Sequence, residues 1–227
     1  MVSRFAGRAF LPALIPAWSL AVALSASAAT LNAAVTDDQG KPVADAVVWA
    51  TPLAPAPAPT RRAPVAILDQ QNREFIPYVL PVEVGTSITF PNNDNIRHHV
   101  YSFSPARKFE LPLYSGVPAA PVLFATPGTV VLGCNIHDWM LAYVQVVSTP
   151  YFARTGAGGD ARLPGLPTGA YEVRVWHPRL KGAPEATAQR VTLAATDAGQ
   201  LGFVIALGRD RRIPRPPLSH YDPRNSP

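Results

Sequence analysis

Proline is the residue that most limits how this chain can fold. It occurs 26 times in 227 residues, whereas charged residues make up only 15%. Proline breaks the interior of a helix but is tolerated in turns and at strand ends. Between residues 65 and 148 the sequence has no helical period, and short apolar runs alternate with turn signals. The sequence therefore predicts an all-β chain of short strands, arranged as a sandwich or barrel.

Apolar runs place the individual strands. The first two, at 31–36 and 43–50, flank an Asp- and Gly-containing turn at 37–42 and are expected to form a hairpin. The stretch from 105 to 121 is expected to be irregular. Further strands are expected at 98–103, 122–124, 129–132, 141–147, 171–176, 191–193 and 201–207.

Side chains that bind metals are concentrated at 133–140. Cys134, the only cysteine, is followed by His137 and Met140 in the spacing Cys-x2-His-x2-Met. Sulfur ligands favour Cu(I) and imidazole suits Cu(II), so this set fits a copper ion that cycles between the two states. Zinc is the main rival, but zinc sites use Cys, His, Asp and Glu rather than methionine. A trigonal site with two histidines and one cysteine still needs a histidine from elsewhere.

The second histidine is expected to be His98 or His99. Both lie in the predicted strand at 98–103. Neighbouring residues of a strand point to opposite faces, so at most one of them can enter the site. The alternation alone does not say which.

Residues 1–29 have the features of a secretory signal peptide. Arg4 and Arg8 precede an apolar run that is broken by two prolines, and Ala26-Ser27-Ala28 fits the small-residue rule for cleavage. These features favour a removable signal over a membrane anchor. No cysteine follows the run, so no lipid anchor is expected, and no other apolar stretch is long enough to span a bilayer. We therefore expect a protein exported to a bacterial periplasm, with no membrane span after cleavage.

Export makes the single cysteine informative. Secreted chains normally pair their cysteines, whereas Cys134 has no partner in the sequence. A bound metal would protect such a thiol from oxidation. The net charge of +5 falls when Arg4 and Arg8 are removed, and much of the remainder lies near the C-terminus. No nucleic-acid partner is expected from this distribution.

Several motifs follow the order that they have in the cupredoxins. They are Val84 to Phe90, Asn93-Asp94, His98-x-Val100, Thr126-Pro127-Gly128 and Cys134-x2-His137-x2-Met140. Over about residues 64–149 the chain therefore resembles this family of small type 1 copper proteins, which includes plastocyanin, pseudoazurin and amicyanin. The short gap before the methionine is most similar to amicyanin. The phrase His-His-Val-Tyr-Ser resembles bacterial methylamine-utilisation proteins.

The resemblance implies a cupredoxin Greek-key β-sandwich with one type 1 copper ion per chain. Carried over position by position, it makes His98, Cys134 and His137 the ligands of a trigonal plane, with Met140 as a long axial ligand. His99 then stands where many cupredoxins have an asparagine that braces the ligand loop, and it remains a fallback ligand.

The resemblance also implies a route for the electron. The edge of His137 is expected to reach the surface, and Trp139, Pro112 and Pro118 are expected to form an apolar docking rim. In plastocyanins an aromatic residue precedes the cysteine. Here that residue is Gly133, so a second route beside the cysteine is not expected.

The flanking segments follow another pattern. Residues 35–48 and 166–173 resemble the carboxypeptidase-regulatory or transthyretin-like β-sandwich; alternatively, residues 30–52 add a strand to the copper domain. The domains that we expect are a signal peptide at 1–29, a discontinuous small β-sandwich formed by 30–52 and 150–208, a Pro-rich linker at 53–63, a cupredoxin domain at 64–149 and a disordered basic tail at 209–227.

Together these features predict a periplasmic mononuclear type 1 (blue) copper protein that transfers electrons between redox protein partners. The alternative is a copper carrier, or a non-redox binding module that uses the same fold. An enzyme is not expected. Multicopper oxidases flank the cysteine with histidines that lead to a second cluster, whereas Gly133 and Asn135 stand here, and a binuclear electron-transfer site needs two cysteines. His177 and His220 are expected to be structural or solvated.

Overall fold

The computed structural model describes residues 28–55, 64–118, 120–195 and 198–214. Most of the predicted signal peptide and linker, and the tail from residue 215 with His220, lie outside the described residues. The described chain forms 17 strands and one short 3-10 helix, η1 (Pro184–Thr187), without an α-helix. The predicted all-β fold is confirmed. In this part of the chain, no helix has the length and apolar character needed to cross a membrane.

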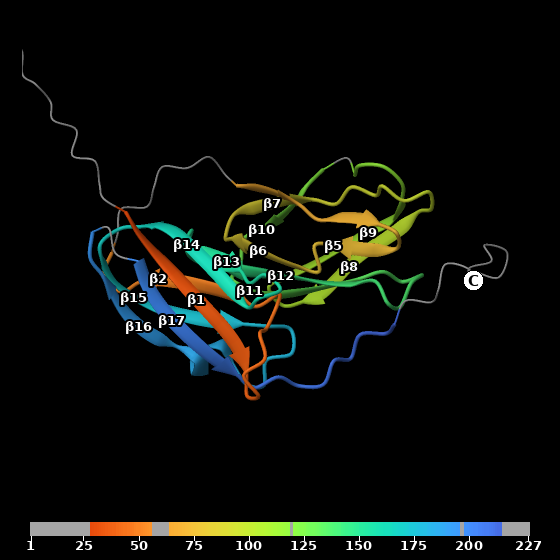
Figure 1. Ribbon diagram of the computed structural model, residues 1–227. Helices are drawn as coiled ribbons and strands as arrows, with labels where there is room; N and C mark the ends of the chain where they lie inside the picture. The colour runs from red at the N-terminus through yellow and green to blue at the C-terminus, as the bar shows by residue number, and fades with distance from the viewer. Residues whose placement is uncertain (1–27, 56–63, 119, 196–197, 215–227) are drawn as a thin grey trace, which may run out of the picture.

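The N- and C-terminal segments pack together as one β-sandwich (Figure 1). Its two sheets enclose a core that includes Leu31, Val48, Val173 and Phe203. One sheet has the order β14 (Asp160–Leu166), β1 (Ala29–Asp37), β17 (Ala198–Ile205). The other has the order β13 (Phe152–Arg154), β2 (Val47–Pro52), β15 (Gly169–Trp176), β16 (Gln189–Leu193).

The middle of the chain forms a second sandwich beside the first (Figure 1). Its core includes Ile88, Phe90, Leu132 and Val144. The larger sheet has the order β6 (Val79–Glu83), β12 (Leu141–Val147), β11 (Gly128–Gly133), β8 (His98–Ser104), β9 (Arg107–Tyr114). The smaller sheet has the order β10 (Val122–Phe124), β7 (Thr86–Thr89), β3 (Val65–Ile67), and a separate pair is formed by β4 (Asp69–Gln71) and β5 (Glu74–Ile76).

A third buried cluster joins the two sandwiches. Trp49 of β2 and Trp176 of β15 pack in it with Val79 of β6 and Val147 of β12. These strands belong to one sheet of each sandwich. Burial of large aromatic side chains stabilises such a contact, so the two sandwiches are held together by apolar packing as well as by the chain.

The expected hairpin of residues 31–36 and 43–50 is wrong. β1 and β2 lie in opposite sheets, and both pair with strands from beyond residue 150. The turn itself forms as expected, because Asp37 accepts hydrogen bonds from the backbone N–H groups of Gln39 and Lys41. The chain then crosses between the sheets through Asp45, which has a φ of 60°. Turn chemistry predicts the reversal of the chain but not the partner of the next strand.

The stretch from 105 to 121, expected to be irregular, contains β9. This strand pairs antiparallel with β8 and is the edge of its sheet. An edge strand has one partner and one free side, so it tolerates Pro112 and charged side chains. Because of Pro112 and the charged residues, the sequence of β9 lacks the apolar run that predicts a strand.

Residues 209–214, which the sequence assigns to a disordered tail, are among the described residues. They run from the first sandwich toward the second (Figure 1). The guanidinium of Arg212 lies 4.9 Å from the centroid of the Tyr78 ring and forms an ion pair with Asp210 at 2.6 Å. A cation over an aromatic ring is a favourable contact that composition does not reveal.

Gly159 is a position that should not tolerate a side chain. Its φ is +78°, and a Cβ there would lie 2.5 Å from the carbonyl oxygen of Val35; Gly165 has the same φ but open space around it. Both alanine variants lose the conformational freedom of glycine, but only Gly159→Ala also collides with backbone. We expect it to lower the free energy of unfolding by about 1–3 kcal/mol more than Gly165→Ala. Chemical unfolding of the two variants measures the difference, and equal losses would contradict the steric account.

Candidate metal centre

Two neighbouring strands and one loop bring three predicted ligands together. His98 begins β8, Cys134 directly follows β11, and His137 lies in the loop before β12. β8 and β11 are adjacent and antiparallel in the sheet. The loop is closed by a hydrogen bond of 2.9 Å from the N–H of Met140 to the carbonyl of His137. The strands therefore fix two of the residues, and a tight turn fixes the third.

Both histidine rings face the sulfur of Cys134. The Nδ1 atom of His98 lies 4.0 Å from Sγ, and the Nδ1 atom of His137 lies 3.9 Å from it. One ligand atom from each residue lies within 4.8 Å of the others. A metal ion held at ~2.3 Å from a thiolate and ~2.0 Å from an imidazole separates the two ligand atoms by roughly 3.6–4.0 Å. The donor atoms are therefore spaced to share a single ion.

The group is buried and its imidazoles are neutral near pH 7. The exposed fraction is 0% for His98 and 4% for both Cys134 and His137. Burial lowers the pKa of His98, against the opposing effect of Asp94. Burial, and then the neighbouring His98, lowers the pKa of His137 to about 4. A neutral ring keeps a lone pair for a metal, which protonation would remove.

Asp94 holds His98 from the far side of its ring. Its Oδ2 atom lies 2.7 Å from Nε2 of His98, and its two oxygens accept hydrogen bonds from the backbone N–H groups of Asn72 and Arg73. When Nε2–H donates to this carboxylate, the lone pair of the neutral ring is on Nδ1, which faces Cys134. The sequence places Asp94 in a polar loop and among the cupredoxin-like motifs, but no local pattern reveals this contact with His98.

His99 lies outside the group. Its Nε2 atom is 2.8 Å from Oε1 of Glu110 on β9, and its ring packs against Tyr101 with centroids 5.4 Å apart. Adjacent strand residues face opposite sides, as the sequence predicts. Of the two candidate histidines, the structure brings His98 to Cys134.

Two further candidates have clear positions. Met140 is buried in the same apolar core as Cys134. His177 is buried near the end of β15, where its Nδ1 accepts a hydrogen bond of 3.1 Å from the N–H of Arg179. Burial lowers the pKa of His177 to about 4. His177 thus has a structural hydrogen bond and lies outside the group of three ligands.

His137, whose edge is expected to reach the surface, is 4% exposed, and its ring lies against Trp139 of the expected rim. The two ring centroids are 5.0 Å apart, and Trp139 is held in place by a hydrogen bond of 3.0 Å from its Nε1 to the carbonyl of Arg73. Among the described residues, Pro112 and Pro118 do not line the hollows beside Trp139. Nothing in the local sequence signals the contact of Trp139 with Arg73, which lies 66 positions earlier.

Although the residue before the cysteine is Gly133, an aromatic residue of the neighbouring strand β8, Tyr101, lies beside it. Tyr101 pairs with Gly133 across β8 and β11, and a Cβ on Gly133 would lie 2.9 Å from the Tyr101 ring. Gly133 therefore allows the ring to lie directly against the backbone before Cys134.

Asp94→Asn is expected to weaken copper binding by about 10-fold or more, because the amide carries no charge to hold the His98 tautomer. Asp138→Asn is the matched control, since this carboxylate lies in the ligand loop but is exposed. Competition with a chelator of known affinity measures both. A loss of the same size in the two variants would mean that overall charge matters, rather than the contact with His98.

No protein-family model matches the chain, and no curated protein matches it. Parts of the structure are similar to solved copper proteins. A copper-containing nitrite reductase from Thermus scotoductus SA-01 is 24% identical over 44% of this chain and 26% of its own, with a TM-score of 0.36. A purple cupredoxin from Nitrosopumilus maritimus is 24% identical over 36% of this chain and 96% of its own, with a TM-score of 0.31. A reduced amicyanin variant is 22% identical over 44% and 99%, with a TM-score of 0.33. The chain thus spans about a quarter of the nitrite reductase, and these similarities do not establish a family.

Proposed function

We propose that this protein binds one copper ion in a type 1 site and transfers electrons. His98, Cys134 and His137 would hold the ion, with Met140 as the axial ligand. The observation that carries the proposal is the convergence of two neutral imidazoles on one buried cysteine sulfur, at distances that suit a single shared ion.

A copper ion bound there would supply a one-electron couple between Cu(I) and Cu(II). The chain's part is to hold the donor atoms still and to keep water away. β8 and β11 anchor two ligands in a paired sheet, and Asp94 fixes the ring of His98. A site that changes little between two oxidation states favours electron transfer over ligand exchange. A catalytic role is not part of this proposal.

We further propose the domain division and the location that the sequence predicts. A copper-binding unit at 64–149 would be inserted into a second sandwich formed by 30–52 and 150–208. The pairing of β1 and β2 with strands from beyond residue 150 supports this division. Residues 1–29 would direct export to the periplasm, where the redox partners would be proteins.

Copper loading of the purified protein tests the function. An intense blue thiolate-to-Cu(II) band and a narrow copper hyperfine splitting are expected, together with fast electron self-exchange. A colourless oxidised protein with its sulfur uncoordinated would contradict the proposal. A blue protein that releases its copper readily to a chelator would favour the copper-carrier alternative.

A further inference from the structure

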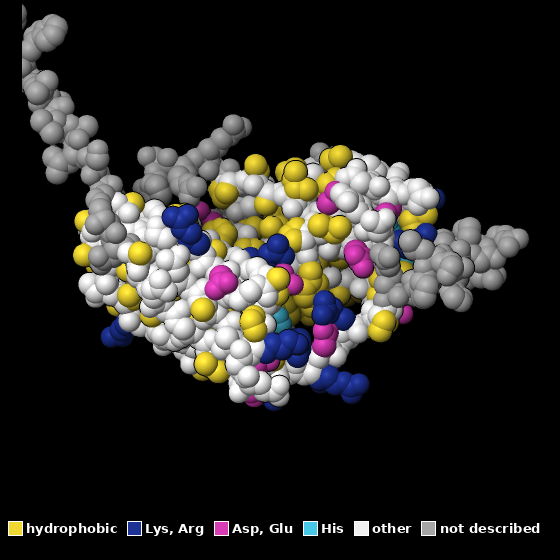
Figure 2. All heavy atoms as spheres, in the orientation of Figure 1, with side chains coloured by type: hydrophobic (Ala, Val, Ile, Leu, Met, Phe, Trp, Pro, Cys, Tyr) yellow, Lys and Arg dark blue, Asp and Glu magenta, His cyan; other side chains and the backbone are white. Residues whose placement is uncertain are grey.

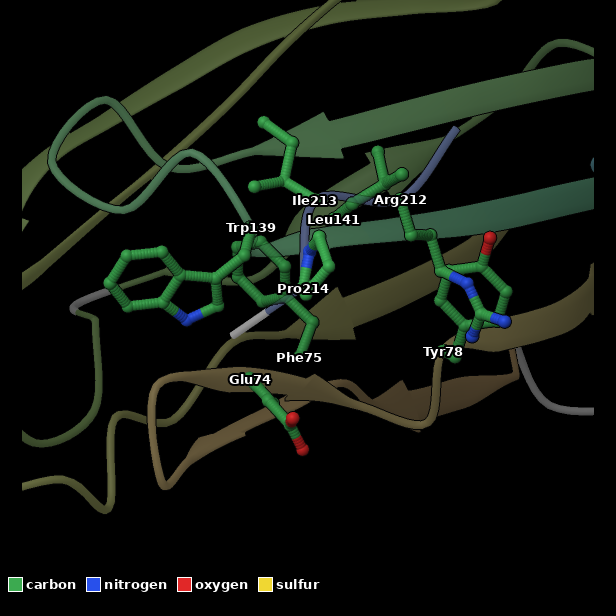
Figure 3. Close-up of a pocket in the computed structure, with 8 residues that line it drawn as sticks. All are labelled: Glu74, Phe75, Tyr78, Trp139, Leu141, Arg212, Ile213 and Pro214. Carbon is green, nitrogen blue, oxygen red and sulfur yellow. The ribbon is translucent and has the colours of Figure 1, made fainter. Parts of the chain in front are cut away.

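The C-terminal segment forms one wall of a groove beside the metal centre. Two backbone hydrogen bonds hold its start on the flanking sandwich: Gly208 N–H to the carbonyl of Arg179 at 2.6 Å, and Lys181 N–H to the carbonyl of Ala206 at 2.9 Å. Arg212 then reaches Tyr78, and the next residues come beside Trp139 and Leu141 (Figure 3). A groove of about 620 Å³ lies between this segment, β8 and the ligand loop.

The floor of this groove is apolar and exposed. Phe103 is 77% exposed and Val131 40%, and both line it, while Ile213 of the wall is 52% exposed. Exposed apolar side chains gathered in one place are characteristic of binding sites, and aromatic residues are enriched at the centre of protein interfaces. Phe103 therefore has the exposure expected of a residue that a partner covers.

The floor also meets the backbone of the candidate site, on the face of β8 that carries His99 and Tyr101. Tyr101 and Cys134 line the same groove. The Tyr101 ring lies against Gly133, and its centroid is 5.2 Å from that of Phe103. His137, in contrast, is buried against Trp139. A partner in the groove would thus approach the cysteine through Tyr101 and the backbone of Gly133.

The rim of the groove is basic. Arg211 and Arg212 line it, and Arg179, Lys181 and Arg209 line the adjoining hollow between the sandwiches. The acidic residues of these two surfaces are Asp138 and Asp210, and Asp210 is paired with Arg212. Figure 2 shows Lys and Arg side chains beside the hollow between the two parts of the molecule, with some Asp and Glu side chains among them. Such a rim attracts an acidic surface and raises its rate of association.

We propose that this groove docks an acidic redox protein, which exchanges an electron with the site through Tyr101 and Gly133. The inference rests on the proposed electron-transfer function. It differs from the route that the family resemblance implies, because that route leaves by the edge of His137. The basic rim would orient the partner, and the apolar floor around Phe103 would be covered by it.

Two small c-type cytochromes in the ferric state, one acidic and one basic, can serve as probes. The reduced, copper-loaded protein would give one electron to the ferric haem, so the protein is oxidised and the haem becomes ferrous. Stopped-flow absorbance is expected to show a faster reaction with the acidic cytochrome, and one that slows as salt is added. Arg211→Glu should slow that reaction by about 10-fold at low ionic strength.

Arg162→Glu is the matched charge reversal, on an exposed position of β14 in the other sandwich, and should change the rate little. Phe103→Ser should slow electron transfer to both cytochromes without moving the blue band. Equal effects at Arg211 and Arg162, or no preference for the acidic cytochrome, would overturn the proposal.

Docking can be separated from redox function by amide NMR. Adding the acidic cytochrome to the metal-free protein is expected to shift the amide signals of Phe103 and Val131, whether or not the protein turns blue with copper. Absence of those shifts would refute the docking surface and leave the proposed copper site untouched. A chain that ends at Pro214 tests whether the protein fills its own groove. If this truncation shifts the same signals without any cytochrome and speeds the reaction, the occupant is residues 215–227, and the proposal is wrong.

Discussion

Cys134→Ser is expected to abolish the blue band of the copper-loaded protein and to leave the fold in place. Cys134 is the only cysteine of the chain, so no other thiolate can give a sulfur-to-copper transition. A serine hydroxyl is nearly the same size but remains protonated near neutral pH and is a poor ligand for Cu(I). Because the position is buried at 4% exposure, the polar group should cost about 1–3 kcal/mol of stability.

Absorbance and electron paramagnetic resonance on the copper-titrated variant provide the measurement, and circular dichroism verifies the fold. Met140→Leu is the natural control, because it keeps a buried apolar side chain of similar size. It should keep the thiolate band and raise the reduction potential. A blue band that survives in Cys134→Ser would show that the sulfur is not a ligand, whatever else the protein binds.

The ligand loop could be predicted because its information is local. Cys134, His137 and Met140 lie within one turn of chain between two strands, and both strands were predicted from their apolar runs. The second imidazole, that of His98, comes from 36 positions earlier than the cysteine. The choice between His98 and His99 depends on which face of β8 meets the core. That face is set by the pairing of Tyr101 with Gly133, which no local pattern reveals.

Contacts between distant segments account for what the sequence did not predict. β1 and β2 do not pair with each other, because each pairs with a strand more than 100 residues later in the chain. Trp139 packs on His137 because the carbonyl of Arg73 accepts its N–H. Arg212 stays on Tyr78 although the surrounding composition is that of a disordered tail. In each case contacts between distant segments override a local tendency.

His98→Ala and His99→Ala are expected to have opposite outcomes, although they remove the same atoms one residue apart on β8. His98 is fully buried between Cys134 and Asp94, so its loss removes one imidazole donor. It leaves the mostly buried carboxylate with its two backbone donors, Asn72 and Arg73. We expect loss of the blue band and a fall in copper affinity beyond the roughly 10–100-fold that an outer partner costs.

His99 contacts Glu110, whose side chain is 68% exposed. Its removal breaks a contact that water can replace, so the band, the hyperfine splitting and the copper affinity should stay close to those of the unmodified protein. Because both variants change the same strand by the same side chain, a general loosening of β8 would affect them alike. A difference between the two variants can therefore come only from the face of β8 on which each histidine lies. A band lost in His99→Ala and kept in His98→Ala would assign the second imidazole to His99, and the contact between Asp94 and His98 would then have no part in holding the metal.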